Sequence, residues 1–178
     1  AEIETLERDK GFIALLRDVD SEFKAYLEAP SWWQSHSEDV DQLKVAYFSA
    51  EFGLHESVPI YYGGLGVLAG DYLKAASDLG LPLTAVGLLY YEGYFSQYLS
   101  ADGWQKETYP QIEMIHLPIK PVLGTDGRPV TVSVEVGSSS VKVRAWKIEV
   151  GRVPLYLLDT NIDENEESLR GITARLYG

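Results

Sequence analysis

The sequence predicts an α/β protein built around one strand–helix–strand unit. Residues 44–49 and 83–91 are apolar runs, and residues 64–79 between them indicate a helix that ends at Gly80. The nearly unbroken apolar run at 83–91 is typical of a parallel strand that is covered on both faces. Two parallel strands joined by a helix form a βαβ unit, and we expect its crossover to be right-handed.

A helical extension is expected over residues 1–43, ahead of a second region at 44–178. Apolar residues over 3–28 recur at intervals of three and four, with charged residues between them. Gly11 could divide this stretch into two helices. Ala29–Pro30 ends it, because the residue before a proline is driven out of the α region. A polar link then leads to the first strand.

Three glycines stand where the central helix should begin: Gly63, Gly64 and Gly66. The first N–H groups of a helix have no intrahelical acceptor, and the helix dipole favours negative charge beside them. With almost no side chain in front of them, these amides can receive an anion such as a phosphate. This segment is the strongest candidate for a binding site in the sequence.

The second half of the chain is expected to be rich in short strands separated by glycine-containing turns. These strands are predicted at 112–120, 130–136, 141–150 and 153–159. Valines alternate with polar residues over 130–136, which predicts a half-buried antiparallel strand. An acidic loop and a final helix follow. Because the chain begins with Ala1 and stops within that helix at Gly178, we expect it to be a truncated piece of a longer protein.

Composition argues against several classes of function. With 178 residues, the chain is long enough for one domain with a proper core. Its net charge of −12 argues against nucleic-acid binding, which depends on clustered lysine and arginine. No apolar run approaches the ~20 residues of a membrane span, and the 3 histidines lack the spacing of a metal site. The absence of cysteine fits a reducing, cytoplasmic compartment.

Several segments, in order and at matching spacing, resemble one enzyme family. They are AYFSAEFGLHES (46–57), IYYGGLGVLAGDYLKAASDLGLPL (60–83), GLLYYEGYFSQ (87–97), DGWQ (102–105), VPLYLLDTN (153–161) and ITARLYG (172–178). The chain resembles the N-terminal part of the α-glucan (glycogen or maltodextrin) phosphorylases, of the bacterial type with a helical N-terminal extension. The resemblance covers nearly the whole chain.

This resemblance implies the Rossmann-like N-terminal domain of a GT-B glycosyltransferase fold. It implies that the whole protein removes glucose from the non-reducing end of an α-1,4-glucan with inorganic phosphate, giving glucose 1-phosphate. Such enzymes use the phosphate group of pyridoxal phosphate, in a cleft between two Rossmann-like domains. The implied partners are the glucan, phosphate and the C-terminal domain of the same chain, and neither nucleic acid nor a membrane.

Carried over by position, the resemblance implies that Gly63 and Gly64 form the turn beside the substrate phosphate. Leu65 would offer its amide to the sugar, and Gly66 would let the helix start tight against the ligand. A second pattern, which we expect to be structural, is matched by Gly87, Tyr90, Gly93, Phe95 and Gln97.

Glu51 and Phe52 match the family's Glu–Phe pair at the strand end beside the active site. Glu51 could accept hydrogen bonds from sugar hydroxyls or orient another group, and His55 is a further candidate for lining the site. Gly53 stands where the animal and plant enzymes have tyrosine, and Tyr62 where asparagine is common. An aromatic contact near the cofactor is therefore missing or supplied from elsewhere.

The lysine that holds pyridoxal phosphate lies in the family's C-terminal domain, and nothing in this chain matches that region. Lys74 is on the helix that follows the glycines and is not a candidate for this role. We therefore expect no catalytic residue in this chain, no cofactor bound by it alone and no turnover by it alone.

Two alternatives remain open. A nucleotide-sugar glycogen or starch synthase also uses a GGLG-type loop, but a lysine usually precedes that loop, where this chain has Tyr61–Tyr62. A non-catalytic carbohydrate-binding module would bind sugars through its 12 tyrosines and 4 tryptophans, whose rings combine an apolar face with a polar tip. In that case the glycines would form only a turn.

Overall fold

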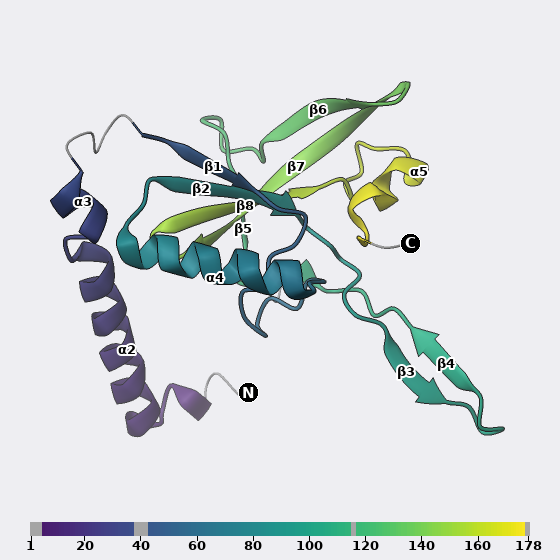
Figure 1. Cartoon of the computed structure of the whole chain (residues 1–178). Helices are drawn as coiled ribbons and strands as arrows, with labels where there is room; N and C mark the ends of the chain where they lie inside the picture. The colour runs from purple at the N-terminus through teal and green to yellow at the C-terminus, as the bar shows by residue number, and fades with distance from the viewer. Residues whose placement is uncertain (1–4, 38–42, 115–116, 177–178) are drawn as a thin grey trace.

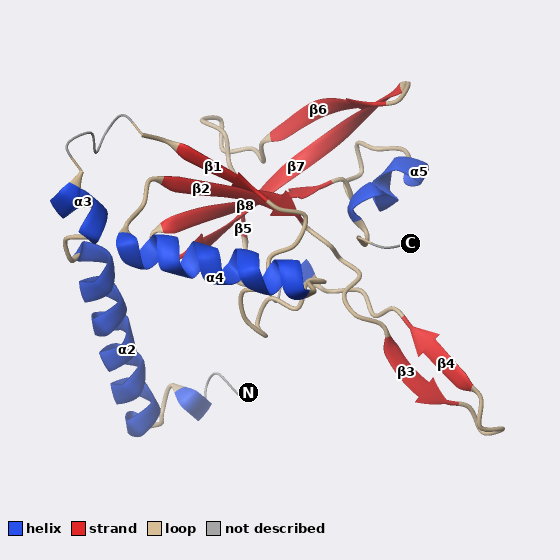
Figure 2. Ribbon diagram, in the orientation of Figure 1, coloured by secondary structure: helices blue, strands red, loops and turns tan. Residues whose placement is uncertain are grey.

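The computed structural model describes residues 5–37, 43–114 and 117–176. Its centre is a mixed sheet with the strand order β1-β2-β8-β7-β5, and β6 pairs with β7 as well. The strands of this sheet are β1 (Val45–Phe48), β2 (Leu83–Leu88), β5 (Lys120–Pro121), β6 (Thr131–Val136), β7 (Ser139–Val150) and β8 (Val153–Asp159). Helix α4 (Gly64–Leu79) lies along the sheet, and an α/β fold is confirmed (Figures 1 and 2).

The predicted βαβ unit is present as β1, α4 and β2. β1 and β2 pair in parallel, with Val45 opposite Leu83, and β2 pairs in parallel with β8. Helix α4 has the predicted bounds and ends at Gly80, which has the left-handed φ of 66° that favours glycine. β2 ends at Leu88 rather than at residue 91, although the Leu89 N–H still donates to the Leu158 carbonyl oxygen of β8 at 2.9 Å.

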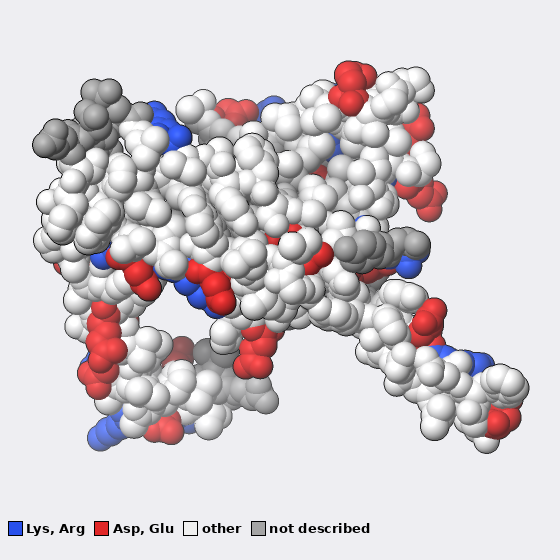
Figure 3. All heavy atoms as spheres, viewed as in Figure 1, with Lys and Arg blue, Asp and Glu red and all other residues white. Residues whose placement is uncertain are grey.

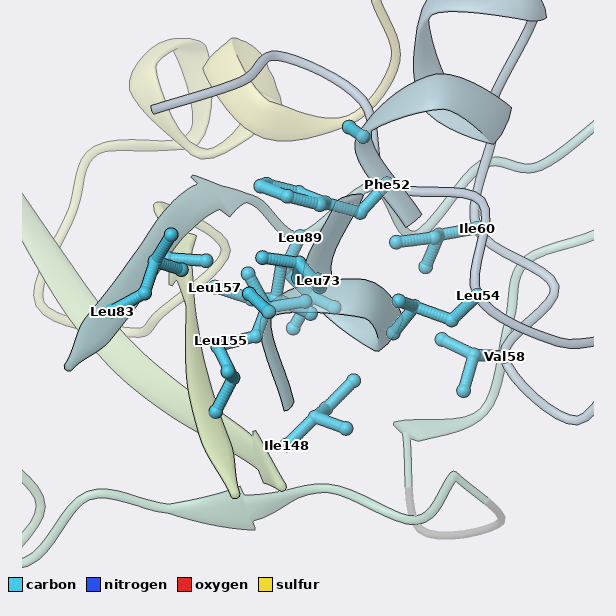
Figure 4. Close-up of a cluster of buried hydrophobic side chains, with 14 residues drawn as sticks. Phe52, Leu54, Val58, Ile60, Leu73, Leu83, Leu89, Ile148, Leu155 and Leu157 are labelled. Atoms are coloured by element: carbon cyan, nitrogen blue, oxygen red, sulfur yellow. The ribbon is translucent and has the colours of Figure 1, made fainter. Parts of the chain in front are cut away.

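The hydrophobic core lies between α4 and one face of the sheet. Figure 4 shows Leu73 of α4 among Leu83 of β2 and Leu155 and Leu157 of β8, all at most 3% exposed. Each fully buried leucine contributes about 1.5–3 kcal/mol relative to an exposed one. The opposite face is only half-buried, so the prediction that 83–91 is covered on both faces was wrong for the described residues.

In the described part of the N-terminal extension, α2 (Lys10–Glu28) and α3 (Trp32–His36) follow a short helical segment that includes Thr5 and Leu6. The Asp9 carboxylate accepts the Gly11 and Phe12 amides and so caps α2. Gly11 therefore lies in the first turn and does not divide the helix. The polar link expected next contains α3 instead, because Ser31 and Gln34 form a capping box that starts a new helix.

A polar cluster attaches α2 to the rest of the molecule. The Arg152 guanidinium lies 4.2 Å from the centre of the Tyr26 ring and donates to the backbone oxygens of Tyr26, Ala29 (3.2 Å) and Ser77 (3.0 Å). The Tyr26 hydroxyl in turn lies 2.6 Å from Ser77 Oγ. No described side chain of α2 is buried, so this cluster carries most of the attachment.

Replacing Arg152 with alanine is expected to loosen α2 from the sheet. The change removes three hydrogen bonds from a charged donor, and each such bond is worth about 1.5–3 kcal/mol before the side chain's own entropy is counted. Limited proteolysis should therefore cut α2 faster in Arg152→Ala. Arg128→Ala, which removes an 86% exposed side chain, should behave as the wild type. Equal cleavage rates for Arg152→Ala and the wild type would contradict this role.

The second half of the chain departs most from the predictions. A two-stranded hairpin, β3 (Ser96–Leu99) and β4 (Gln105–Thr108), was missed, and it projects from the body in Figure 1. The strand predicted at 112–120 was wrong: among the described residues of this range, only Lys120 lies in a strand, β5, and Pro118 cannot donate to a ladder. β6 is exposed throughout rather than half-buried, so neither of its faces is covered within the described part of the chain.

Two short helical segments, α5 (Glu167–Arg170) and η2 (Gly171–Thr173), form the predicted C-terminal helix region. They are tied to the end of β8 by the Thr160 and Thr173 hydroxyls, 3.0 Å apart.

The face of the molecule in Figure 3 is mostly uncharged across its middle, and its acidic and basic side chains lie mainly toward the edges. None of the helices in the described ranges is long and apolar enough to cross a membrane.

Candidate functional site

The glycine segment follows β1, so it lies beyond the carboxyl end of a parallel strand. Ligands of open α/β sheets commonly bind at this edge. The chain leaves β1 at Phe48, passes through the buried Glu51 and Phe52, and returns to start α4 at Gly64. The predicted site residues therefore belong to one loop region that packs against the first turn of α4.

Glu51 caps the start of α4 from inside the protein. Its carboxylate is 5% exposed, and Oε2 accepts the Gly63 N–H at 2.5 Å and the Gly66 N–H at 3.2 Å. Ser49 Oγ holds this corner by donating to the Glu51 carbonyl oxygen at 2.8 Å. The residue at the N-cap, Gly63, has no side chain that could accept the first backbone N–H groups of the helix. The buried Glu51 carboxylate accepts them instead, and its negative charge lies at the positive end of the helix dipole.

Two amides at the helix start remain without an acceptor. The N–H groups of Gly64 and Leu65 have no hydrogen-bond partner among the described residues, and both residues are exposed. They lie between Gly63 and Gly66, whose amides already donate to Glu51. Of the four residues predicted to contact phosphate and sugar, Gly64 and Leu65 are thus the two whose amides are free to donate, and these contacts stay a prediction.

The two central glycines differ in what surrounds them. Apart from its chain neighbours and the backbone of its own helix, a Cβ on Gly64 would meet no described atom within 4 Å, so the space in front of this residue is open. A Cβ on Gly66 would fall 2.5 Å from the Tyr62 Cβ and 3.0 Å from the Glu51 Cβ. Gly66 is therefore needed for close packing inside the protein, whereas Gly64 leaves room for a ligand.

Gly53 and Tyr62, the two departures from the family pattern, are in contact. A Cβ on Gly53 would lie 2.6 Å from Cδ2 of the Tyr62 ring, so the tyrosine ring occupies the space that a side chain at position 53 would fill. The Gly53 N–H also donates to the Gly66 carbonyl at 2.8 Å. An aromatic ring is thus present beside this loop, supplied by Tyr62.

Phe52 and His55 lie in different surroundings. Phe52 is 1% exposed and packs edge-on against Tyr47, with ring centres 6.0 Å apart, so it belongs to the core beneath the loop. His55 is exposed, and its Nδ1 accepts the Ser57 amide at 3.2 Å. Among the described contacts, neither side chain reaches the Gly64 or Leu65 amide, and their part in lining the site stays a prediction.

Tyr94 is a neighbour of the site that sequence reasoning missed. Its hydroxyl donates to the Tyr62 carbonyl oxygen, and its ring lies 4.9 Å from that of Tyr61. Partial desolvation, followed by the nearby Tyr61, Tyr62 and Glu51, raises the pKa of Tyr94, against the hydrogen bond to the Tyr62 backbone. Tyr94 lies between Gly93 and Phe95, which were predicted to be structural, and the tyrosine-rich run from 90 to 94 was the signal that could have identified it.

Asp159 is a second buried acidic residue, at the end of β8. Its carboxylate accepts the Trp146 indole N–H at 3.1 Å and the Asn161 amide at 2.8 Å. Burial is the main cause that raises its pKa, against the opposing effect of these donors. Asp159 therefore fixes the turn that follows β8.

No group of three His, Cys, Asp or Glu side chains that could hold a metal occurs within the described ranges.

Comparison with known proteins identifies relatives along the whole chain. Residues 1–58 match a family described as a protein of unknown function (DUF3417). A glycogen phosphorylase of Mycobacterium tuberculosis (strain CDC 1551 / Oshkosh) is 47% identical over 100% of this chain and 21% of its own length. A maltodextrin phosphorylase of Thermococcus litoralis is 42% identical over 98% of this chain and 21% of its own length.

A glycogen phosphorylase of Aquifex aeolicus is 40% identical over 98% of this chain and 25% of its own length. The chain therefore spans about a fifth to a quarter of these relatives. Their alignment with this chain includes β1, the glycine segment and α4, the elements that build the site. Along its whole length, the chain is therefore homologous to part of proteins named glycogen phosphorylase and maltodextrin phosphorylase.

Proposed function

We propose that the chain supplies the glycine-loop side of the substrate site in an α-1,4-glucan phosphorylase. The whole protein would use inorganic phosphate to release glucose 1-phosphate from the non-reducing end of a glucan. The observation that carries this proposal is the pair of exposed, unpartnered amides of Gly64 and Leu65 at the start of α4. The relatives named glycogen and maltodextrin phosphorylases support the choice of substrate.

In this proposal the Gly64 and Leu65 amides bind oxygen atoms of the phosphate and of the reacting glucose. Two N–H donors and the positive end of a helix dipole stabilise negative charge, and they need no rearrangement to do so. The open space at Gly64 lets an oxygen approach the backbone closely. The chain would be part of a Rossmann-like domain of a GT-B fold, with the second half of the cleft formed by the rest of the protein.

Glu51 acts in this proposal as a positioning residue. Because its carboxylate holds the Gly63 and Gly66 amides, the loop is fixed on both sides of the two amides offered to substrate. A carboxylate that already accepts two backbone donors at 5% exposure is poorly placed to bind sugar hydroxyls directly. Its contribution is the shape of the loop.

Pyridoxal phosphate would supply a phosphate group for acid–base chemistry in the whole protein. The residues of this chain do not fit the task of holding its aldehyde end. Lys74, the lysine of α4, is 52% exposed and lies 3.7 Å from the Asp71 carboxylate, well beyond the first turn of the helix. In this proposal the lysine for the cofactor comes from another part of the protein, and no catalytic residue is assigned to this chain.

Two other functions would use the same segment differently. A nucleotide-sugar glycogen or starch synthase is disfavoured by Tyr61–Tyr62 before the glycines, where those enzymes usually have a lysine. A carbohydrate-binding module would need the aromatic side chains but not the two exposed amides. Neither function requires inorganic phosphate, and this distinguishes both from a phosphorylase.

Phosphate-dependent release of glucose 1-phosphate from maltoheptaose tests the proposal, with the full-length protein assayed with and without pyridoxal phosphate. We expect release that depends on both phosphate and cofactor, and none from the 178-residue chain alone. Extension of maltoheptaose from a nucleotide-glucose, without phosphorolysis, would replace the proposal with the synthase. Glucan binding with neither reaction would favour the binding module.

A further inference from the structure

Tyr62, directly before Gly63, rests against two glycines. A Cβ on Gly53 would lie 2.6 Å from Cδ2 and 2.9 Å from Cγ of the Tyr62 ring, and a Cβ on Gly66 would lie 2.5 Å from the Tyr62 Cβ. Tyr62 is half-buried, whereas both glycines are buried. Approaches this close are possible because neither glycine carries a side chain. A side chain at position 53 or 66 would therefore push Tyr62 out of its place.

The surface beneath Tyr62 is part of the backbone contact between the loop and α4. The Gly53 N–H donates to the Gly66 carbonyl oxygen at 2.8 Å. One turn further along α4, a Cβ on Gly70 would lie only 2.0 Å from the Gly53 carbonyl oxygen. The backbone at Gly53 thus lies against α4 at two points, and the Tyr62 ring lies where Gly53 lacks a side chain. The position of the ring is thereby fixed relative to the start of α4.

Tyr94 contacts Tyr62 through both its backbone and its ring. The Tyr94 hydroxyl donates to the Tyr62 carbonyl oxygen. The two rings meet edge-on, at 79° with centres 6.3 Å apart, and the Tyr61 ring lies 4.9 Å from that of Tyr94. Edge-to-face contacts between aromatic rings are favourable. Tyr94 therefore holds the segment that leads into the glycines.

One peptide unit joins these contacts to the start of α4. The carbonyl oxygen of Tyr62 and the N–H of Gly63 belong to the same peptide bond, which is planar. Tyr94 donates to the oxygen of this unit, and Glu51 Oε2 accepts its N–H at 2.5 Å. The unit cannot turn without breaking one of these two hydrogen bonds. The direction in which the chain enters the glycines is therefore set from both edges of one plane.

We propose that Tyr62 is a positioning residue, which sets the direction in which the Gly64 and Leu65 amides point. It acts through the backbone, because its ring on Gly53 and its carbonyl oxygen bound to Tyr94 fix the peptide before the glycines. Glycine backbone is otherwise free to adopt many conformations. Donors that are aligned in advance need no rearrangement when a negatively charged oxygen arrives. The link to substrate rests on the proposed phosphorylase function.

Tyr62 and Gly53 act as a pair, which predicts non-additive effects in the full-length protein. Gly53→Ala displaces the ring, and Tyr62→Ala removes it. We expect each to lower kcat for phosphorolysis of maltoheptaose about tenfold, because small displacements of positioned groups reduce rates strongly. The double variant should be no slower than Tyr62→Ala alone, since no ring is left for the methyl group at position 53 to displace.

Tyr94→Phe separates positioning from stability, should Tyr62→Ala unfold. It keeps the ring and removes one hydroxyl from a residue that is 54% exposed, so the unfolding midpoint should stay near that of the wild type. We expect kcat to fall about tenfold, because the Tyr62–Gly63 peptide loses one of its two anchors. Tyr98→Phe is the matched control, since Tyr98 is 49% exposed and pairs with Lys106 in the β3–β4 hairpin. It should match the wild type in both measurements.

Hydrogen exchange of the full-length protein gives a readout that does not depend on activity. The peptide that contains Gly63 and Gly66 should exchange faster in Tyr62→Ala and Tyr94→Phe, because the amides held by Glu51 open more often. Tyr98→Phe should leave this peptide unchanged. Wild-type exchange and wild-type kcat in both loop variants would overturn the inference, as would losses of rate that simply add in the double variant.

The outcome is separable from that of the proposed function. Faster exchange with an unchanged kcat would refute the positioning role of Tyr62 and leave the phosphorylase intact. Faster exchange in the same variants, in a full-length protein that releases no glucose 1-phosphate, would support the role of Tyr62 in orienting the amides and refute the phosphorylase.

Discussion

Replacing Glu51 with alanine is expected to lower the free energy of unfolding by about 3 kcal/mol, because the Gly63 and Gly66 amides lose their acceptor. Gly66 is buried, so water cannot replace the carboxylate there, and an unsatisfied buried donor costs about 1–3 kcal/mol. The midpoint of urea unfolding of the 178-residue chain measures the loss.

Glu51→Gln is the matched variant, because its amide oxygen can still accept one of the two donors while the negative charge at the helix start is lost. We expect it to lose roughly half as much stability as Glu51→Ala, since a neutral hydrogen bond is weaker than a charged one. In the full-length protein both variants should lose phosphorolysis at temperatures where they remain folded. Unfolding midpoints equal to that of the wild type would show that Glu51 does not hold the loop.

Replacing Gly64 with alanine is expected to reduce phosphorolysis by about 100-fold or more while leaving stability unchanged. The new methyl group meets no protein atom within 4 Å, and Gly64 has a helical conformation that alanine adopts readily. The methyl group stands instead where a substrate oxygen must approach the backbone N–H. Loss of one such preorganised donor costs about 10²–10³ in rate.

Gly66→Ala is the control for this prediction, since it should lose stability, whereas Gly64→Ala should lose activity at unchanged stability. Its methyl group would be forced against Tyr62 and Glu51, so the unfolding midpoint should fall before any effect on substrate can be measured. The pair separates a ligand-facing glycine from a packing glycine two positions away. If Gly64→Ala catalysed phosphorolysis at the wild-type rate, the Gly64 amide would not be part of the substrate site.

Local signals determined what could be predicted from the sequence. The bounds of α4 were predicted correctly: the helix begins at Gly64, directly after Gly63, and it ends at Gly80, whose left-handed φ favours glycine. β8 was likewise found at its predicted bounds, where a short apolar run lies between turn residues. The family was recognised from segments that align as contiguous sequence.

Contacts between distant residues could not be predicted. Nothing local to Glu51 shows that its carboxylate reaches amides 12 and 15 residues further along the chain. The contact between Gly53 and Tyr62 is of the same kind, because each residue alone looks like a simple departure from a pattern. The valines of β6 alternate as a half-buried strand would, but alternation does not reveal whether another element covers that face.

The most direct test of the central claim is a crystal structure of the full-length protein with glucose 1-phosphate bound. The claim predicts ligand oxygens within hydrogen-bond distance of the Gly64 and Leu65 nitrogens, at about 2.7–3.2 Å, with Glu51 still accepting the Gly63 and Gly66 amides. A ligand that contacts neither Gly64 nor Leu65, or a Glu51 carboxylate turned away from the loop to bind the sugar, would contradict it.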